Sequence, residues 1–179
     1  PIINVLADME KEGISIDSSY LSKLDKEFEV ELSKLKKGIF EKSGEEFNLN
    51  SPKQLGDILF EKLKLVSKPK KTKTGQYSTS EEVLSSLAGE HEIIRNILEW
   101  RSLDKLQNTY VRSLPNEVNN RSGRIHTKFN QTVTTTGRLS SNNPNLQNIP
   151  IRTQNGQKIR EAFIPRSQEF ELLAADYSQ

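Results

Sequence analysis

The chain has 179 residues, of which 26 are Lys or Arg, 24 are Asp or Glu and none is Cys. The absence of cysteine excludes disulfide bonds, thiolate metal sites and a cysteine nucleophile. No apolar run approaches the roughly 20 residues of a membrane-spanning helix, and no signal peptide opens the chain. Because the first residue is Pro1 and not Met, we expect a piece of a longer protein.

Charge is distributed unevenly along the chain. Residues 1–61 hold 8 basic and 13 acidic side chains, residues 62–117 hold 10 and 7, and residues 118–179 hold 8 and 4. The near-neutral total therefore combines an acidic first third with a basic remainder. This asymmetry indicates a polyanionic partner on one side of the protein.

Apolar residues at steps of three and four predict helices throughout the first 115 residues. Asp17 or Ser18, Ser51 and Thr79 are the expected N-caps of three of them, with Thr79 forming a capping box with Glu82. The predicted helices cover about residues 2–12, 18–42, 52–63, 80–89 and 92–112. The apolar stripe of residues 18–42 favours packing of one helix face on a neighbour, and a self-associating coiled coil is the alternative.

The segment between two of these helices contains six lysines, from Lys62 to Lys73 inclusive. It contains no acidic residue before Ser80. Residues 64–77 have few apolar side chains and predict a flexible cationic loop. Such a loop, with free backbone N–H groups, can follow phosphates without reading bases. An ordinary solvated surface loop is an equal alternative.

The sequence after Pro115 is different in kind. Residues 124–129 and 132–136 predict two strands joined by Asn130 and Gln131, residues 140–150 predict an irregular segment, and residues 171–176 predict a buried strand. The expected fold class is α+β, with a helical lobe over residues 1–115 and the start of a lobe with small antiparallel strands over 116–179.

Residues 118–160 contain seven Lys or Arg, twelve Asn or Gln and no acidic residue. Arginine neutralises phosphate, and amides donate hydrogen bonds to the acceptors on base edges. This composition favours a nucleic-acid groove over a merely polar surface. Asp176, at the end of an apolar run, suits either a surface position or a cation. His91 and His126 are too far apart to suggest zinc, and no Ser-His-Asp or Walker pattern is present.

Three motifs of the second half resemble the family A DNA polymerases, the bacterial DNA polymerase I type. They are Thr-Gly-Arg-Leu-Ser-Ser at 136–141, Pro-Asn-Leu-Gln-Asn-Ile-Pro at 144–150 and Ala-Asp-Tyr-Ser-Gln at 175–179. Residues 47–55, 78–80, 110–111 and 124–127 resemble the same family in the same order. The resemblance covers effectively the whole chain and implies a thumb subdomain with its entry helix over 1–115 and the first part of a palm over 116–179.

The resemblance also implies roles for individual residues. Asp176 would be the first metal-binding carboxylate and the catalytic residue, and the backbone carbonyl of Tyr177 a further metal ligand. Arg152, Tyr177 and Gln179 would lie on the nucleotide side of the site. The implied DNA contacts are Asn48, Asn50, Ser51, Lys70, Lys71, Thr72, Lys73, Thr74, Ser78, Thr79, Ser80, Arg101, Lys105, Arg138, Ser140, Asn145 and Gln147.

The implied activity is DNA-directed nucleotidyl transfer in replication and repair, with two Mg²⁺ ions, a primer–template duplex and deoxynucleoside triphosphates as partners. The resemblance further implies a bacterial, cytoplasmic, nucleoid-associated monomer without membrane attachment. The fingers and the second metal carboxylate are not in the chain, so we expect it to be inactive alone. The alternatives are a non-catalytic duplex-binding module, part of a single-subunit RNA polymerase, and a helical interaction domain without nucleic acid.

Overall fold

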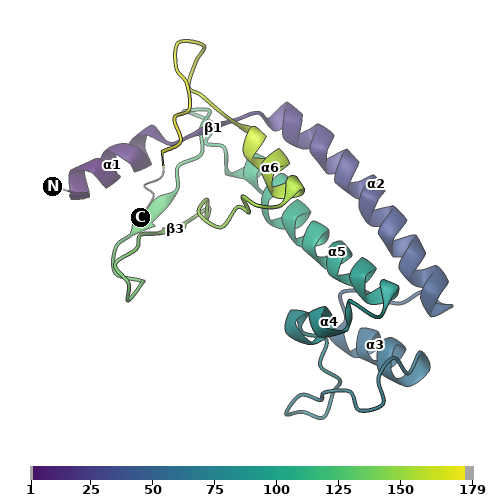
Figure 1. Cartoon of the computed structure of the whole chain (residues 1–179). Coiled ribbons are helices and arrows are strands. Elements are labelled where there is room, and N and C mark those ends of the chain that lie inside the picture. The colour runs from purple at the N-terminus through teal and green to yellow at the C-terminus, as the bar shows by residue number, and fades with distance from the viewer. Residues whose placement is uncertain (1, 176–179) are drawn as a thin grey trace. The chain divides into compact units, whose positions relative to one another are not determined.

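A computed structural model describes residues 2–175 of the chain (Figure 1). It divides into two compact units: residues 1–27 with 106–179, and residues 28–105. Helices α2 (Ser18–Ser43) and α5 (Glu92–Leu106) each contribute residues to both units. The expected α+β class, mostly helical with small antiparallel sheets, is confirmed. The division into a thumb of residues 1–115 and a palm of residues 116–179 stays a prediction.

The first unit opens with α1 (Ile2–Glu12) and β1 (Ser15–Ile16), separated by Gly13, at φ +65°, and Ile14. β1 pairs antiparallel with β4 (Phe163–Ile164), so that Ser15 faces Ile164. β2 (Lys128–Asn130) pairs antiparallel with β3 (Ser140–Asn142), and Phe129 faces Ser141. Helix α6 (Gln154–Glu161) precedes β4. The buried centre of this unit includes Leu6, Leu21, Leu24, Leu114, Ile125 and Ile159.

The second unit contains most of α2, α3 (Pro52–Gly56), its π-helical continuation η1 (Asp57–Lys62), α4 (Glu81–Leu87) and most of α5. Its buried side chains include Phe28, Ile39, Leu55, Leu59, Leu84, Ile94 and Ile97. The burial of the α2 stripe inside the chain agrees with the predicted packing of one helix face. Asp17 caps α2, since its Oδ1 accepts hydrogen bonds from the backbone N–H groups of Ser19 and Tyr20, both at 2.9 Å.

Two predicted helices end in wider turns. η1 continues α3, and η2 (Gln107–Val111) continues α5, before the short 3₁₀ turn η3 (Leu114–Glu117). The wider turns are closed by backbone hydrogen bonds over five residues, from Leu63 to Ile58 at 3.0 Å and from Arg112 to Gln107 at 2.9 Å. The predicted helical ranges are therefore confirmed, whereas the π-helical turns were not foreseen.

The predicted strand over residues 132–136 is wrong. This segment is part of the loop between β2 and β3, and the side chain of Val133 is 66% exposed. β3 begins only at Ser140, because Gly137 at φ +75° turns the chain. The β-branched residues that suggested a strand therefore face water and have no opposing strand.

The predicted buried strand over residues 171–176 is also wrong for residues 171–175, which the structure describes. Residues 171–175 have no regular structure, and Leu172 and Leu173 are 55% and 93% exposed. A strand needs a neighbour to satisfy its backbone hydrogen bonds, and among residues 2–175 no strand pairs with this segment. Asp176 lies outside the described residues.

Candidate nucleic-acid interface

The lysine-rich segment of the second unit folds into a tight turn, which we call the lysine hairpin (residues 70–78). Lys71 forms a β-bridge with Tyr77, and the backbone N–H of Thr72 donates to the carbonyl of Gln76 at 2.7 Å. Gly75, at φ +82°, supplies the left-handed residue that the turn requires. The expected flexible loop is thus an ordered hairpin, and several of its N–H groups are used internally.

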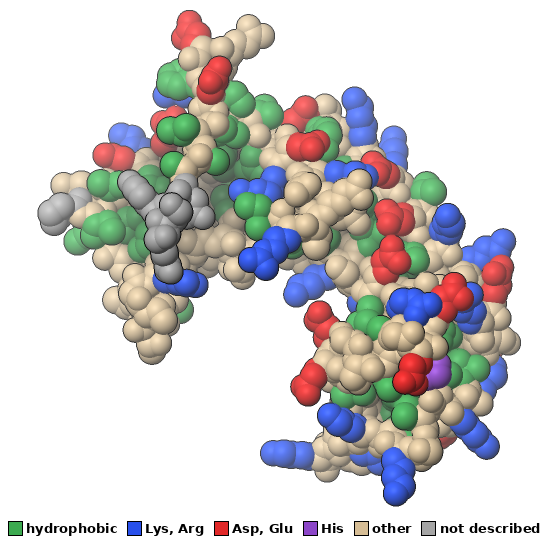
Figure 2. Space-filling model, in the orientation of Figure 1, with side chains coloured by type: hydrophobic (Ala, Val, Ile, Leu, Met, Phe, Trp, Pro, Cys, Tyr) green, Lys and Arg blue, Asp and Glu red, His purple; other side chains and the backbone are tan. Residues whose placement is uncertain are grey.

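The cationic side chains of this hairpin point outward. Lys70, Lys71 and Lys73 are exposed, as are Thr72 and Thr74. Figure 2 shows Lys and Arg side chains projecting around the end of the second unit where the hairpin connects η1 to α4. No acidic residue lies within residues 62–80, so every charged side chain of this segment attracts a chain of phosphates.

Tyr77 fixes the hairpin to the helix beneath it. Its ring centroid lies 5.4 Å from that of Phe60, and the Nζ atom of Lys71 lies 5.0 Å from the centre of the Tyr77 ring. A Cβ atom on Gly56 would come within 2.8 Å of the Cβ of Tyr77, so only glycine permits this approach. Burial, followed by a hydrogen bond to Glu61, raises the pKa of the Tyr77 hydroxyl.

The predicted contacts Asn48, Asn50 and Ser51 lie at the start of α3. Ser51 is the N-cap, and its Oγ accepts from the backbone N–H of Gln54 at 3.4 Å. The Oδ1 of Asn48 accepts from the N–H of Asn50 at 2.9 Å, and both asparagines are exposed. The structure therefore brings these three side chains together on one short turn of the second unit.

The segment 78–80 leads into α4. Its cap is Ser80, whose Oγ accepts from the N–H of Val83 at 3.4 Å, so the predicted capping box on Thr79 is wrong. Thr79 is buried, and its carbonyl and hydroxyl accept hydrogen bonds from Arg101 at 2.6 and 3.4 Å. Burial lowers the pKa of the Arg101 guanidinium. Ser78 is partly exposed and Lys105 is exposed.

In the first unit, the predicted contacts follow β2 along the chain. Arg138 is exposed in the loop that leads to β3, and Ser140 begins β3. Asn145 and Gln147 are exposed in the segment 142–148, which we call the amide-rich turn. The Oδ1 of Asn145 accepts from the backbone N–H of Gln147 at 3.0 Å. Arg152 is exposed one residue before Thr153, the N-cap of α6.

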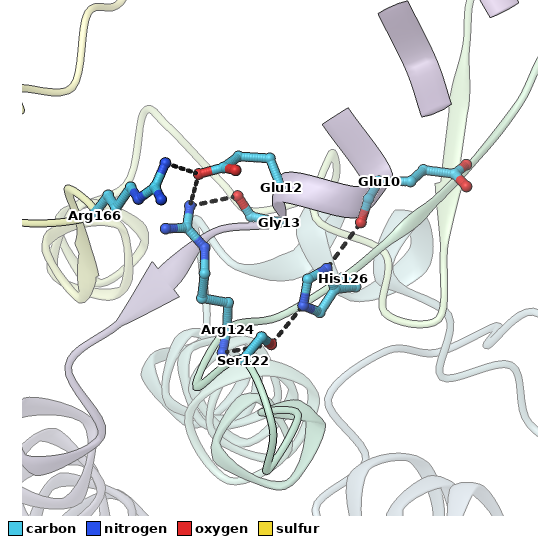
Figure 3. A network of polar contacts seen from close by, with 7 residues as sticks. All are labelled: Glu10, Glu12, Gly13, Ser122, Arg124, His126 and Arg166. Carbon is cyan, nitrogen blue, oxygen red and sulfur yellow. Dashed lines mark hydrogen bonds and ion pairs between the residues drawn. The ribbon is translucent and has the colours of Figure 1, made fainter. Parts of the chain in front are cut away.

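A polar network holds the start of this region to α1 (Figure 3). The Nδ1 of His126 lies 2.8 Å from the carbonyl of Glu10, and its Nε2 lies 2.6 Å from the Oγ of Ser122. Because a carbonyl can only accept, Nδ1 carries a proton and donates to Glu10, and Nε2 forms the second hydrogen bond with the hydroxyl of Ser122. Arg124 donates to the carbonyl of Gly13 at 2.8 Å and pairs with Glu12 at 3.3 Å. His126 is therefore structural.

Three predicted site residues, Asp176, Tyr177 and Gln179, lie outside the described residues. Within residues 2–175, no group of three or more His, Asp or Glu side chains could hold a metal ion. In the same part of the chain, no helix has the length and apolarity needed to cross a membrane. The described surfaces can supply phosphate contacts and amide donors.

Sequence reasoning missed two groups of residues that shape these surfaces. They are the aromatic pair of Phe60 and Tyr77 under the lysine hairpin, and the buried hydroxyls of Thr127 and Ser141 behind the amide-rich turn. No periodicity marks either pair, because the partners lie far apart along the chain.

Known proteins are similar to this chain in sequence, and a solved structure is similar to it in fold. The chain is 51% identical to DNA polymerase I of Geobacillus stearothermophilus over its whole length, and 53% identical to DNA polymerase I of Synechocystis sp.. It is 50% identical to the thermostable DNA polymerase I of Thermus thermophilus. In each case the chain is fully covered but spans only 18–21% of the relative.

A solved structure agrees with these relatives. It is described as the POL domain of Pol1 from M. smegmatis in complex with DNA primer-template and dNTP, and matches with a TM-score of 0.79 and 45% identity. The match covers 89% of this chain and 28% of the other. The sequence profile of DNA polymerase family A matches residues 18–179. The chain belongs to DNA polymerase family A.

Proposed function

We propose that the chain is part of a DNA-directed DNA polymerase and binds a primer–template duplex. In this proposal residues 1–115 form the thumb, and residues 116–179 form the first part of the palm. Family membership is the observation that carries the proposal, since relatives about 50% identical over the whole chain are DNA polymerases I. The exposed lysine hairpin and the acid-free stretch 118–160 support it independently.

The two surfaces have different tasks in this function. Lysines on a projecting hairpin neutralise phosphates whatever the base sequence, and hydroxyl groups beside them donate to phosphate oxygens. Asn145 and Gln147 carry amide donors suited to the minor groove, where acceptors occur at every base pair. Donors placed there test the geometry of a pair, as a polymerase requires near the primer end.

The catalytic step needs a metal site that Asp176 would help to form. The proposed donors, the carboxylate of Asp176 and the carbonyl of Tyr177, are hard oxygen ligands of the kind that Mg²⁺ prefers. Two Mg²⁺ ions, when bound, would lower the pKa of the primer hydroxyl and stabilise the leaving pyrophosphate. Arg152, Tyr177 and Gln179 would face the incoming nucleotide. One carboxylate does not fix two ions, so we propose that the 179-residue chain alone does not extend primers.

Two measurements test the proposal. Fluorescence anisotropy with a labelled primer–template, at 50 and 200 mM salt, should show binding that weakens steeply with salt. Absence of binding at 50 mM salt would refute the DNA-binding function. Primer extension should be absent for the chain alone and present in a polymerase that carries this chain as its thumb and early palm. In that polymerase, Asp176→Ala should abolish extension, and retained extension would refute the assigned role.

A further inference from the structure

Two buried hydroxyl groups connect the backbone on the two sides of Asn145. Thr127 immediately precedes β2, and Ser141 lies in β3; they are only 8% and 3% exposed. The Oγ1 of Thr127 and the Oγ of Ser141 are 2.6 Å apart. The Oγ of Ser141 accepts from the backbone N–H of Leu146 at 3.1 Å, and the Oγ1 of Thr127 donates to the carbonyl of Pro144 at 2.7 Å.

The direction of the protons in this network can be assigned. The N–H of Leu146 can only donate and the carbonyl of Pro144 can only accept, while each hydroxyl has a single proton. The shortest arrangement therefore runs from Leu146 to Ser141, from Ser141 to Thr127 and from Thr127 to Pro144. The other contacts, from Thr127 to the Asn142 carbonyl at 3.1 Å and from Ser141 to the Pro144 carbonyl at 3.2 Å, are longer. Bonds aligned in one direction in a buried site strengthen one another.

This chain of hydrogen bonds fixes both peptide groups that flank Asn145. The Oδ1 of Asn145 accepts from the N–H of Gln147, so its NH₂ group remains to donate. The side chains of Asn145 and Gln147 are both exposed, whereas the two hydroxyls behind them are buried. The buried pair thus determines how two outward-facing amides are presented.

We propose that Thr127 and Ser141 are positioning residues, which hold Asn145 and Gln147 in the geometry needed to donate to acceptors in the minor groove. The inference rests on the proposed function. It adds that discrimination at base edges depends on two side chains that do not touch DNA. Neutral hydroxyls suit this task, because they add no charge that would alter the phosphate contacts.

The experiment uses the 179-residue chain, with Thr127→Val, an isosteric change that removes only the hydroxyl. Thr127→Ser retains the hydroxyl, Ser141→Ala removes the second one, and Thr135→Val is the matched control at an exposed position in the loop before β3. Two readouts are compared. One is hydrogen exchange of the Leu146 and Gln147 amides, and the other is affinity for a natural duplex relative to one whose minor-groove N3 acceptors near the primer end are replaced by carbon.

The expected wild-type preference for the natural duplex is about tenfold or more. Thr127→Val and Ser141→Ala should speed exchange at Leu146 and lose most of this preference, with the salt dependence unchanged. Thr127→Ser and Thr135→Val should match the wild type. Unchanged exchange in Thr127→Val, or faster exchange with full preference, overturns the inference. A wild-type chain that binds both duplexes without preference also overturns the inference, while the proposed duplex binding stands. A wild-type chain that binds neither duplex refutes the proposed function, so the wild-type measurement distinguishes the two failures.

Discussion

The ring of Tyr77 lies against the ring of Phe60, with centroids 5.4 Å apart and planes tilted by 50°. Tyr77 belongs to the lysine hairpin, and Phe60 is buried in η1. This pair therefore joins the exposed cationic turn to the buried part of the second unit. From its composition the segment is expected to be a flexible loop. The aromatic pair gives it a defined shape.

Removing the Tyr77 ring should disturb the shape of the hairpin and leave its charge unchanged. Tyr77→Ala is expected to lower the free energy of unfolding by about 1–3 kcal/mol, because a partly buried aromatic pair is lost. Duplex affinity should fall while the salt slope stays the same, since every lysine remains. Denaturant unfolding and binding titrations measure both. Tyr77→Phe keeps the ring and is the control; an equal loss in that variant would show that the hydroxyl, not the ring, matters.

Neutralising the lysines of the hairpin should lower both the duplex affinity and its salt slope. Lys70, Lys71 and Lys73 changed together to Gln are expected to weaken binding to all duplex sequences alike and to reduce the salt slope by up to about three phosphate equivalents. Binding titrations over a series of salt concentrations measure the slope. The matched control changes Lys34, Lys36 and Lys37 of α2 to Gln. A slope that is unaltered, or reduced equally in the control, would remove the hairpin from the interface.

The helices could be predicted from the sequence because each has its own apolar periodicity and residues that favour helix ends on both sides. The long stripe of α2, with Asp17 before it and Gly44 after it, specifies both the helix and its buried face. The strands could not be predicted equally well. Residues 132–136 have the composition of a strand but pair with no strand in the described part of the chain, whereas Ser140–Asn142 lacks that composition and pairs with β2. Strand pairing is a tertiary property, and local propensity only weakly anticipates it.

The candidate site also has parts that could be predicted from the sequence and parts that could not. The residue types that suit a polyanionic partner are evident in the composition of residues 62–80 and 118–160. The buried side chains behind them could not be recognised in the same way. Thr127 and Ser141 are of the same polar type as residues on the surface, and Phe60 is one of many core residues. Arg101 illustrates the converse, because its guanidinium donates to Thr79 within the second unit. Its predicted contact with DNA stays a prediction.

Arg138 should contribute an individual, measurable contact near the primer end. Its exposed guanidinium follows Gly137 in the loop that leads to β3. Arg138→Ala is expected to weaken binding of a recessed primer–template by about 1–3 kcal/mol, a factor of about 5 to 150, as for loss of one bidentate base contact. Arg121→Ala removes an exposed arginine from another turn of the same unit and serves as the control. Equal affinities for the two variants would count against a special role of Arg138.

The cap of α2 should give the protein a specific dependence on acid. The hydroxyl of Ser19, the backbone N–H of Tyr20 and the charge of Lys23 favour the ionised carboxylate of Asp17, which lowers its pKa below the ordinary value of 3.8. Its contribution to stability is therefore complete above pH 3.8, where Asp17 is ionised in the unfolded chain too, and is lost as the pH falls through the lower pKa of the folded state.

Thermal unfolding from pH 7 to pH 2 tests this expectation. Asp17→Ala should melt at a lower temperature than the wild type at pH 7, and the difference should shrink below pH 3.8. Asp17→Asn keeps an acceptor for the helix N-terminus without a titratable charge, and should retain most of the stability at all pH values. A difference between wild type and Asp17→Ala that is constant down to pH 2 would show that the charge of the cap contributes nothing.

A buried amide should be as important to stability in the first unit as the apolar residues around it. Gln107, 1% exposed in η2, donates from Nε2 to the Oδ1 of Asp25 at 2.8 Å and to its carbonyl at 3.2 Å. Gln107→Leu keeps a similar volume but leaves these acceptors without that donor, so the free energy of unfolding should fall by about 1–3 kcal/mol. Gln131→Leu, at an exposed position, should change it by less than about 0.5 kcal/mol. Denaturant titration decides the matter: equal stabilities of the two variants would mean that Arg112, whose Nε also donates to the Oδ1 of Asp25 at 2.8 Å, satisfies this carboxylate without the amide.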